Sequence, residues 1–297
     1  MSRPISAKPK KISSDKMFDI FNYALLTLLI IAVAYPLYYV LIASISDPYE
    51  VYGGKTFLLP SKITFEGYFR VFQEESIARG YLNSIYYTVL GTVISVALII
   101  TTGYCVSKKT LPFRKAIMVF YVFTMYFNGG LIPTYLVVSK LGMLNSVWAL
   151  ILPGGVAVFN VIVARTFFES SIPEDLYEAA AIDGSSNLRT FVRIALPLAK
   201  PILAVMVIFT MVAYWNDWFT ALIYMNEKSK YPLQLALRQV LIQSQATATM
   251  MGNMDGGYAE ANKITELIKF ASIVVGPVPM LIAYPFVQKY FEKGFMA

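Results

Sequence analysis

The sequence predicts an all-α membrane protein with six transmembrane helices, and two observations carry this prediction. Of the 297 residues, 57% are hydrophobic and 14% are charged, whereas about a quarter of the residues in a soluble domain are charged. A membrane-spanning helix needs about 20 apolar residues. Six stretches, the fifth of which resumes after Asp217, approach or exceed that length without Asp, Glu, Lys or Arg: residues 20–46, 80–107, 116–139, 141–164, 201–216 and 270–288.

Turn-forming and charged residues set the ends of the predicted helices. The third, fourth and sixth helices also carry internal breaks, at 127–133, 153–155 and 276–277, where Gly and Pro leave backbone groups without helical partners. Such breaks either line a translocation path or permit close packing through small residues, and the sequence leaves both readings open. The predicted bounds are about 18–46, 80–107, 116–139, 146–168, 198–224 and 267–290.

Basic residues orient the chain. Lys and Arg concentrate in residues 1–17, in the short loop 107–115, in 165–200 and after residue 288, while the intervening loops are longer and carry fewer. The positive-inside rule therefore predicts that both termini and the loop 169–197 are cytoplasmic. Residues 1–17 lack an apolar core and are predicted to be a disordered cytoplasmic tail, and 18–297 to be a single domain. The net charge of +7 thus reflects topology, and no nucleic-acid partner is predicted.

Composition also limits the chemistry of the chain. It has no histidine and one cysteine, Cys105, which excludes an internal disulfide and removes the usual general base and the commonest metal ligand. We predict no catalytic residues and no metal ligands. A proton-driven secondary carrier remains an alternative function, although the first four charge-free stretches offer no acids for a proton relay.

A short match to a phosphate-binding loop fails on inspection. Gly54-Lys55-Thr56 fits the last three positions of the motif, but Tyr49 stands where its leading glycine is required and no buried strand precedes it. We therefore predict that this chain binds no nucleotide and no other cofactor. Any ATPase that drives transport must be a separate chain.

The polar segment 169–197 is predicted to fold as a helix–turn–helix. Ser171 and Glu174 have the spacing of a capping box, and the first helix should end at Asp183-Gly184. Ser185 or Ser186 can cap the second helix. Acids and small alanines on the first helix permit close approach of a partner surface. From the residues alone, an ordinary surface loop and a docking element are equally good interpretations.

This segment resembles a known family motif. The residues Glu178-Ala179-Ala180, Asp183-Gly184, Ile194 and Leu196-Pro197 resemble the EAA loop of the membrane subunits of ATP-binding-cassette (ABC) importers. The resemblance extends over about residues 15–297. It implies the type I importer transmembrane fold and docking of the first helix on an ATPase. The residues expected to couple to that ATPase are Glu178, Ala179, Ala180, Asp183 and Gly184.

Other stretches resemble the carbohydrate-uptake class of these permeases. They are Leu141-Gly142, 144–146, Trp215-Asn216 and 231–237, while 127–136 is similar to permeases for complex oligosaccharides, including products of plant cell-wall breakdown. The resemblance implies a multi-pass subunit of a prokaryotic cytoplasmic membrane that moves an oligosaccharide by alternating access. A permease for another polar solute is the alternative.

The resemblance also implies partners. It implies a second homologous permease, forming a heterodimer if the two differ. Two ATPase subunits would bind ATP and magnesium, and an extracellular or periplasmic protein would bind the solute and select it first.

A cluster in the fifth predicted helix is the main candidate for the substrate path. Aromatic rings can face the C–H groups of sugars, amides and carboxylates can bind hydroxyls, and an acid at membrane depth is a functional candidate. The alternative is an interfacial aromatic belt in which the acid caps or pairs. The cluster comprises Tyr214, Trp215, Asn216, Asp217 and Trp218. Further candidates are Asn160 and, before the break at 127–133, Tyr126 and Asn128.

Overall fold

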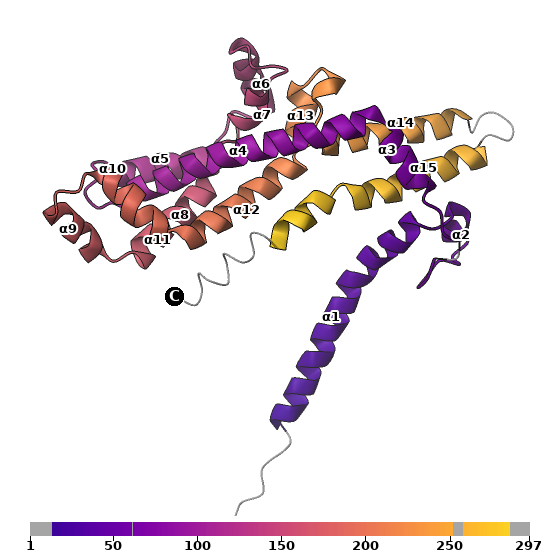
Figure 1. The fold of residues 1–297 in the computed structure, drawn as a ribbon, viewed down its shortest axis with the longest axis horizontal. Coiled ribbons are helices and arrows are strands. Elements are labelled where there is room, and N and C mark those ends of the chain that lie inside the picture. Colours follow the sequence, from indigo (N-terminus) through magenta and orange to yellow (C-terminus); the bar gives the residue numbers. More distant parts are fainter. Residues whose placement is uncertain (1–13, 61, 252–257, 286–297) are drawn as a thin grey trace, which may run out of the picture.

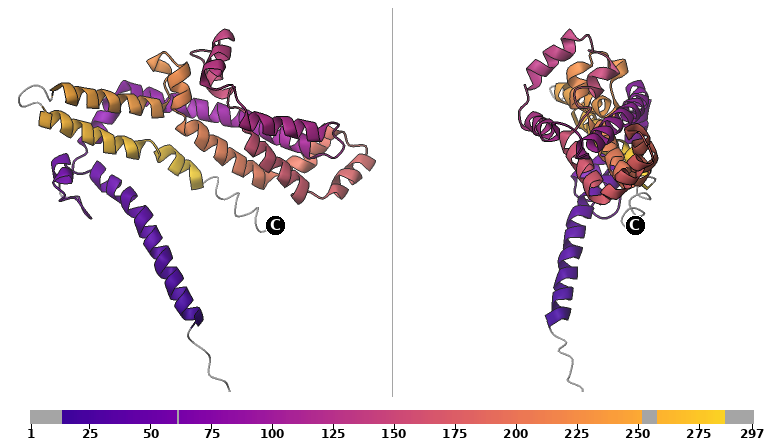
Figure 2. Two further views of the ribbon diagram at one scale, coloured as in Figure 1. Left: turned by 180° about the vertical axis from the view of Figure 1, so that it is seen from behind. Right: turned by 90° about the vertical axis from the view of Figure 1, so that its left-hand side faces the viewer.

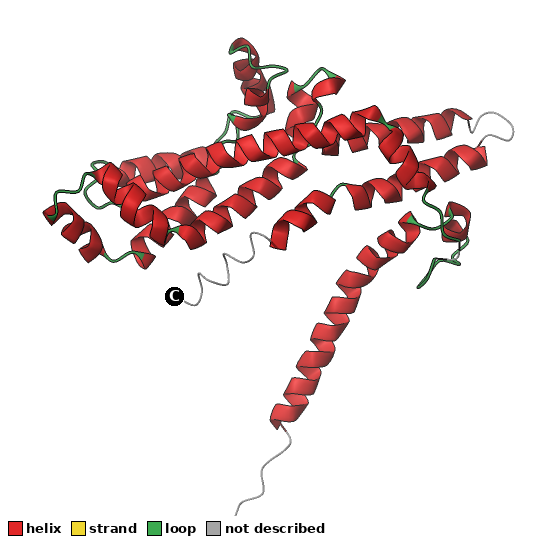
Figure 3. Ribbon diagram, in the orientation of Figure 1, coloured by secondary structure: helices red, strands yellow, loops and turns green. Residues whose placement is uncertain are grey.

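The computed structural model describes residues 14–60, 62–251 and 258–285, which are helical apart from their connections and one bridge between Ser46 and Ile63 (Figures 1 and 3). Most of the helices form an elongated bundle. The helices are α1 (Ser14–Ser44), α2 (Pro48–Tyr52), α3 (Glu66–Gln73), α4 (Glu75–Ser107), α5 (Arg114–Tyr126), α6 (Leu131–Lys140), α7 (Val147–Ile151), α8 (Val158–Ser171), α9 (Glu174–Ile182), α10 (Asn187–Thr190), the π-helix Phe191–Ala195, α11 (Leu196–Leu198), α12 (Lys200–Asn216), α13 (Phe219–Tyr224), the 3-10 helix Lys228–Lys230, α14 (Leu233–Met251) and α15 (Tyr258–Val275).

Helix α4 runs along most of the bundle and packs against α8, α12 and α14. Its 33 residues correspond to about 50 Å at 1.5 Å per residue. Two glycines allow α8 and α12 to approach α4 closely. A Cβ on Gly103 would lie 2.7 Å from the Cβ of Ala164, and one on Gly91 would lie 2.8 Å from the Tyr214 ring. Small residues therefore fix α4 against both neighbours, as is common in membrane bundles.

Two ends of this bundle matter for function. At one end, α9, α10 and α11 follow α8, and the adjoining core contains Ile99, Phe168 and Met206. Toward the other end, α3, α14 and α15 pack on the first half of α4, with Trp215 and Leu233 in their core. We call these the α9 end and the α14 end.

Helix α1 diverges from the bundle in every view (Figures 1 and 2). It contacts α15, and most of its large apolar side chains are exposed. The predicted tail 1–17 lies outside the described residues except for 14–17, which begin α1 instead of preceding it.

The described residues contain three helices long and apolar enough to cross a membrane, or five if each of two bent pairs is one span. The three are Lys16–Ser44, Glu75–Ser107 and Lys263–Pro285. The predicted span 146–168 instead consists of α7, a turn segment and the 14-residue α8. The count of six, like the orientation of the termini, therefore remains a prediction.

The helix breaks expected from Gly and Pro are confirmed. Helices α5 and α6 meet at 110° around 127–130, α7 and α8 are separated at 152–157, and a turn at Gly276-Pro277 interrupts the last span. One break was missed: the predicted helix 198–224 ends at Asn216 and resumes as α13. The glycine- and methionine-rich sequence of 247–258 predicts an external loop, but 247–251 belong to α14 and Tyr258 begins α15, while 252–257 lie outside the described residues.

Candidate functional site: the coupling helix and the central cavity

Helix α9 ends in the turn that the sequence predicts. Gly184 has φ +73°, a left-handed conformation that glycine adopts without strain. Its N–H donates to the Ala181 carbonyl at 3.0 Å, and the N–H of Ser185 donates to the Ala180 carbonyl at 2.9 Å. This pair of hydrogen bonds is a Schellman motif, which satisfies the last carbonyls of the helix and reverses the chain.

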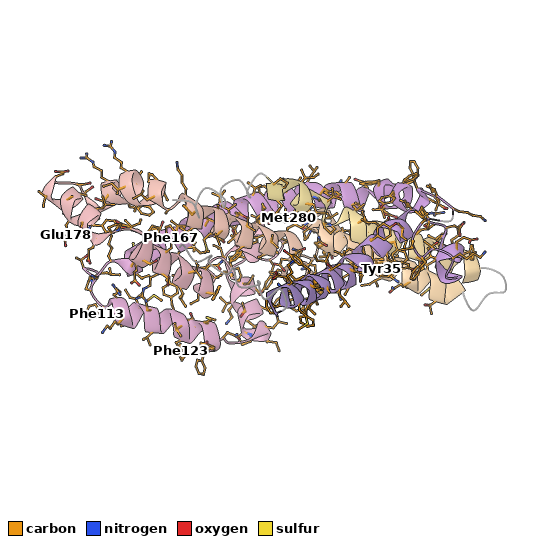
Figure 4. The ribbon with its side chains drawn as sticks, turned by 90° about the horizontal axis from the view of Figure 1, so that it is seen from below. Tyr35, Phe113, Phe123, Phe167, Glu178 and Met280 are labelled. Carbon is orange, nitrogen blue, oxygen red and sulfur yellow. The ribbon has the colours of Figure 1, made fainter. Side chains whose placement is uncertain are left out.

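The predicted coupling residues divide between two faces of α9. Glu178, Ala179 and Asp183 are exposed with the turn glycine, whereas Ala180 is 6% exposed and faces the bundle. Figure 4 places Glu178 at the extreme of the long axis of the molecule. The exposed face therefore offers acids and a small side chain, and Ala180 packs on the opposite face, against the bundle.

The start of α9 differs from the prediction. Ser171 is the last residue of α8, so the capping box between Ser171 and Glu174 does not form, and Pro173 precedes α9 without a side-chain cap. The carboxylate of Glu174 instead pairs with Lys109. At the second helix, Ser186 is the cap, accepting the N–H of Arg189 at 3.4 Å.

Lys108, directly after α4, joins that helix to α9. Its ammonium lies over the ring of Tyr177 on α9 and 4.8 Å from the ring centroid of Tyr104 on α4. Ion pairs surround this contact: Lys109 with Glu174, and Arg114 with Glu169 at 3.0 Å. Lys108, Tyr177 and the four ion-paired residues line a cavity of about 290 Å³.

Burial changes the ionisation of both partners. It lowers the pKa of Lys108 to about 8, against the opposing effect of Glu174. Burial and the neighbouring Tyr104 raise the pKa of Tyr177 to about 12. The contact between Lys108 and Tyr177 was missed from the sequence, where the loop 107–115 was used only for topology. A lysine directly after a long apolar helix is only a weak signal for such a contact, because the sequence does not show which aromatic ring lies beside it.

The second helix of the loop also packs on α4. Its π-helical turn, 191–195, places Phe191 4.7 Å from Tyr104 between ring centroids. Pro197 lacks an N–H and cannot bond to the carbonyl four residues earlier, which favours an irregular turn before it. Both helices of the predicted helix–turn–helix thus contact the same end of α4.

A cavity of about 520 Å³ lies between α4, α8, α12 and α13. Its lining includes four predicted path residues: Asn160, Tyr214, Asn216 and Asp217. The interrupted segments also contribute, through Leu131 after the α5–α6 bend and Pro153, Gly154 and Gly155 between α7 and α8. The breaks in the third and fourth predicted spans therefore reach one cavity.

Hydrogen bonds hold the polar lining in place. The hydroxyls of Tyr214 and Ser95 lie 2.8 Å apart, which ties α12 to α4. The Asn216 amide donates to the Val212 carbonyl at 2.9 Å, and an Asp217 carboxylate oxygen accepts the N–H of Thr220 at 3.0 Å. Asp217 therefore lines the cavity and also accepts a hydrogen bond from the first turn of α13.

Four predicted path residues lie elsewhere. Trp215 is 2% exposed and donates its indole N–H to the Gly276 carbonyl at 3.1 Å. Trp218 lies under the guanidinium of Arg238. Tyr126 and Asn128 are exposed at the α5–α6 bend and do not line the cavity. Trp215 belongs to the core shared with α14 and α15, and Trp218 packs against α14.

Comparison with known proteins identifies the family. Residues 107–296 match the model of the binding-protein-dependent transport system inner membrane component. The chain belongs to this family.

Within the ranges that the structure describes, no three His, Cys, Asp or Glu side chains gather as a metal site would require.

Relatives of this inner membrane component include sugar permeases. The chain is 39% identical to the polygalacturonan/rhamnogalacturonan transport system permease protein YtcP of Bacillus subtilis strain 168, covering 94% of this chain and 96% of that one. It is 28% identical to the diacetylchitobiose uptake system permease protein NgcG of Streptomyces coelicolor, covering 93% and 87%.

A solved structure supports the fold. The crystal structure of a bacterial ABC transporter involved in the import of the acidic polysaccharide alginate contains a chain that superposes with a TM-score of 0.82. That chain is 34% identical, and the alignment covers 96% of this chain and 100% of that one. The fold is that of a type I ABC importer permease, a membrane-embedded multi-pass protein.

Proposed function

We propose that this chain is a membrane-spanning permease subunit of an ATP-driven oligosaccharide importer. One observation carries the proposal: α4 contacts the candidate coupling helix through Lys108 and the central cavity through Ser95. The two positions are 13 residues apart, or about 20 Å along a helix. A displacement of α9 would therefore reach the cavity through a single rigid element.

In the proposed mechanism, this connection couples α9 to alternating access. ATP binding would close two partner ATPases, which hold the exposed face of α9. The movement would pass through Tyr177 and Lys108 to α4, and through the Ser95–Tyr214 contact to the cavity. Each step is a population shift, which works only if ATP binds one arrangement better than the other.

The remaining partners follow from what the chain contains. It has no phosphate-binding loop, so ATP and magnesium would bind to the ATPases. The family is named for its dependence on a binding protein, which would deliver the solute. The exposed apolar surface of α1 suits lipid or a sister permease that completes the path. In this arrangement six spans place both termini in the cytoplasm of a prokaryote.

The proposed substrate class is an oligosaccharide, including the uronate-containing products of plant cell walls. The relatives named above handle polygalacturonan/rhamnogalacturonan, diacetylchitobiose and alginate. The cavity offers a Tyr hydroxyl, two Asn amides, the Asp217 carboxylate and the ring of Phe219. Aromatic faces with a few polar groups are typical of sites for polar ligands.

Reconstitution tests this function. The chain, its sister permease, the ATPases and the binding protein are incorporated in proteoliposomes, and uptake of labelled oligogalacturonate is measured with and without ATP. We expect uptake only with ATP and all four components. Uptake that persists without the ATPases would instead support a secondary carrier, and uptake of another polar solute alone would correct the substrate class.

A further inference from the structure

We propose that Arg238 and Trp218 form a binding site for the carboxylate of an acidic sugar beside the central cavity. The inference rests on the proposed function and names the chemical group that this part of the path recognises. Two features carry it: Trp218 lies between residues that line the cavity, and among the described residues no acid pairs with the charge of Arg238.

The break between α12 and α13 places the pair. Asp217, Phe219 and Thr220 line the cavity on both sides of Trp218 in sequence, while the ring of Trp218 turns toward α14. The guanidinium carbon of Arg238 lies 3.6 Å from the ring centroid. The cation is thus held against the segment that forms one wall of the cavity, and it remains exposed.

The charge of Arg238 has no carboxylate partner among the described residues. The acids nearest in sequence to this wall are engaged elsewhere: Asp217 accepts the N–H of Thr220, and Glu227 pairs with Lys230 at 3.1 Å. The guanidinium carbon lies over the Trp218 ring, and within the described residues no acceptor is bound to the guanidinium N–H groups. An anionic ligand can therefore approach these N–H groups without breaking an ion pair.

This geometry suits a carboxylate. The planar fork of arginine matches two carboxylate oxygens, and stacking on an indole fixes the plane of the fork before the ligand arrives. The carboxylate of a uronate residue is such a group.

The test compares an acid with its neutral ester. Digalacturonate and its dimethyl ester differ in charge but share the sugar skeleton. Uptake of each is measured in the reconstituted transporter with wild type, Arg238→Gln and Arg238→Lys, and each variant is normalised to wild type, so that the preference of the binding protein cancels. We expect Arg238→Gln to lower uptake of the acid about 10-fold more than uptake of the ester, with Arg238→Lys intermediate.

A binding measurement keeps the test decisive if the binding protein rejects the ester. Tryptophan fluorescence of the complex is titrated with each sugar in the absence of binding protein, with Trp218→Phe to identify the responding ring. Saturable quenching by the acid that Arg238→Gln weakens about 10-fold supports the site. Equal effects on acid and ester, or no quenching, would overturn it. Failure of wild type to take up any oligosaccharide would overturn the proposed function instead.

Discussion

The α9 end and the central cavity are held together by different interactions. At the α9 end, the Lys109–Glu174 ion pair and Lys108, which lies over aromatic rings, join the end of α4 to α9. Around the cavity, hydroxyls and backbone carbonyls make the contacts, as between Ser95 and Tyr214. The first set depends on charge and therefore on pH. The second is neutral apart from the Asp217 carboxylate, and we expect its response to pH to be much weaker.

The difference suggests a division of labour along α4. A charged contact at a surface can break and re-form as a partner moves, whereas neutral hydrogen bonds within a packed core keep a cavity in shape. Changes at the α9 end should then uncouple ATP hydrolysis from transport. Changes at the cavity should alter transport while leaving the response to the ATPase intact.

The largest effect is expected for Gly184→Asp. A branched, charged side chain at φ +73° strains the turn and adds an acid to the exposed face of α9. We expect loss of uptake and of substrate-stimulated ATP hydrolysis, with the protein still present in the membrane. Gly142→Asp is the matched control, since Gly142 also has a positive φ, +67°, and an open environment but lies between α6 and α7. Equal losses in both variants would contradict a specific role for the α9 turn.

A substantial but smaller effect is expected at Lys108. Its pKa of about 8 means that the cation over Tyr177 is lost as pH rises through 8. Substrate-stimulated ATP hydrolysis should fall over that range, and Lys108→Gln should be low throughout. Lys108→Arg keeps its charge and should remove the decline near pH 8. A decline that persists in Lys108→Arg would place the titrating group elsewhere.

The stability of the folded chain should change with pH in the opposite direction to the ATP hydrolysis. The pKa of Lys108 is lowered from 10.5 in the reference state, so between about pH 8 and 10.5 the unfolded chain binds more protons than the folded one. The contribution of this group to the free energy of unfolding therefore increases as pH rises in that window. Thermal unfolding of the complex, measured at pH 7.5 and 9, separates the effect of pH on stability from its effect on coupling. Weaker coupling without loss of stability is the expected combination.

The smallest effect is expected for Tyr214→Phe. It removes the hydroxyl contact with Ser95 while the ring still packs against Gly91. A neutral hydrogen bond contributes about 1 kcal/mol, so we expect a several-fold decrease in uptake with ATP hydrolysis still responsive. Tyr87→Phe removes a comparable bond, to the Lys230 carbonyl at 3.0 Å, outside the cavity lining. Uncoupled hydrolysis in Tyr214→Phe would contradict the division of labour.

Local signals in the sequence predicted much of this arrangement. The charge-free stretch 80–107 indicated α4 because burial in lipid excludes charge over a continuous length. Gly184 identified the turn because few other residues adopt its φ without strain. The Gly and Pro breaks were located from backbone chemistry alone, and Asn160 was predicted to lie on the same path as the cluster in the fifth span.

What the sequence did not reveal depends on contacts between distant segments. The charge-free stretch ending at Asn216 gave no sign that α12 stops there, so the break before α13 was missed. Ser171 had the spacing of a cap but is the last residue of α8, and Glu174 pairs across the loop with Lys109. Tyr177 and Arg238 acquire roles only when residues far away in sequence approach them.

The central claim is that α4 carries the movement of α9 to the cavity, and one labelling experiment tests it most directly. Cys105→Ser removes the only native thiol, and Ala213→Cys then places one on an exposed residue that lines the cavity. The rate of thiol labelling is measured in the complete transporter before and after ATP addition. We predict an ATP-dependent change with Lys108 present and none with Lys108→Gln. The same ATP-dependent change in both would contradict the account.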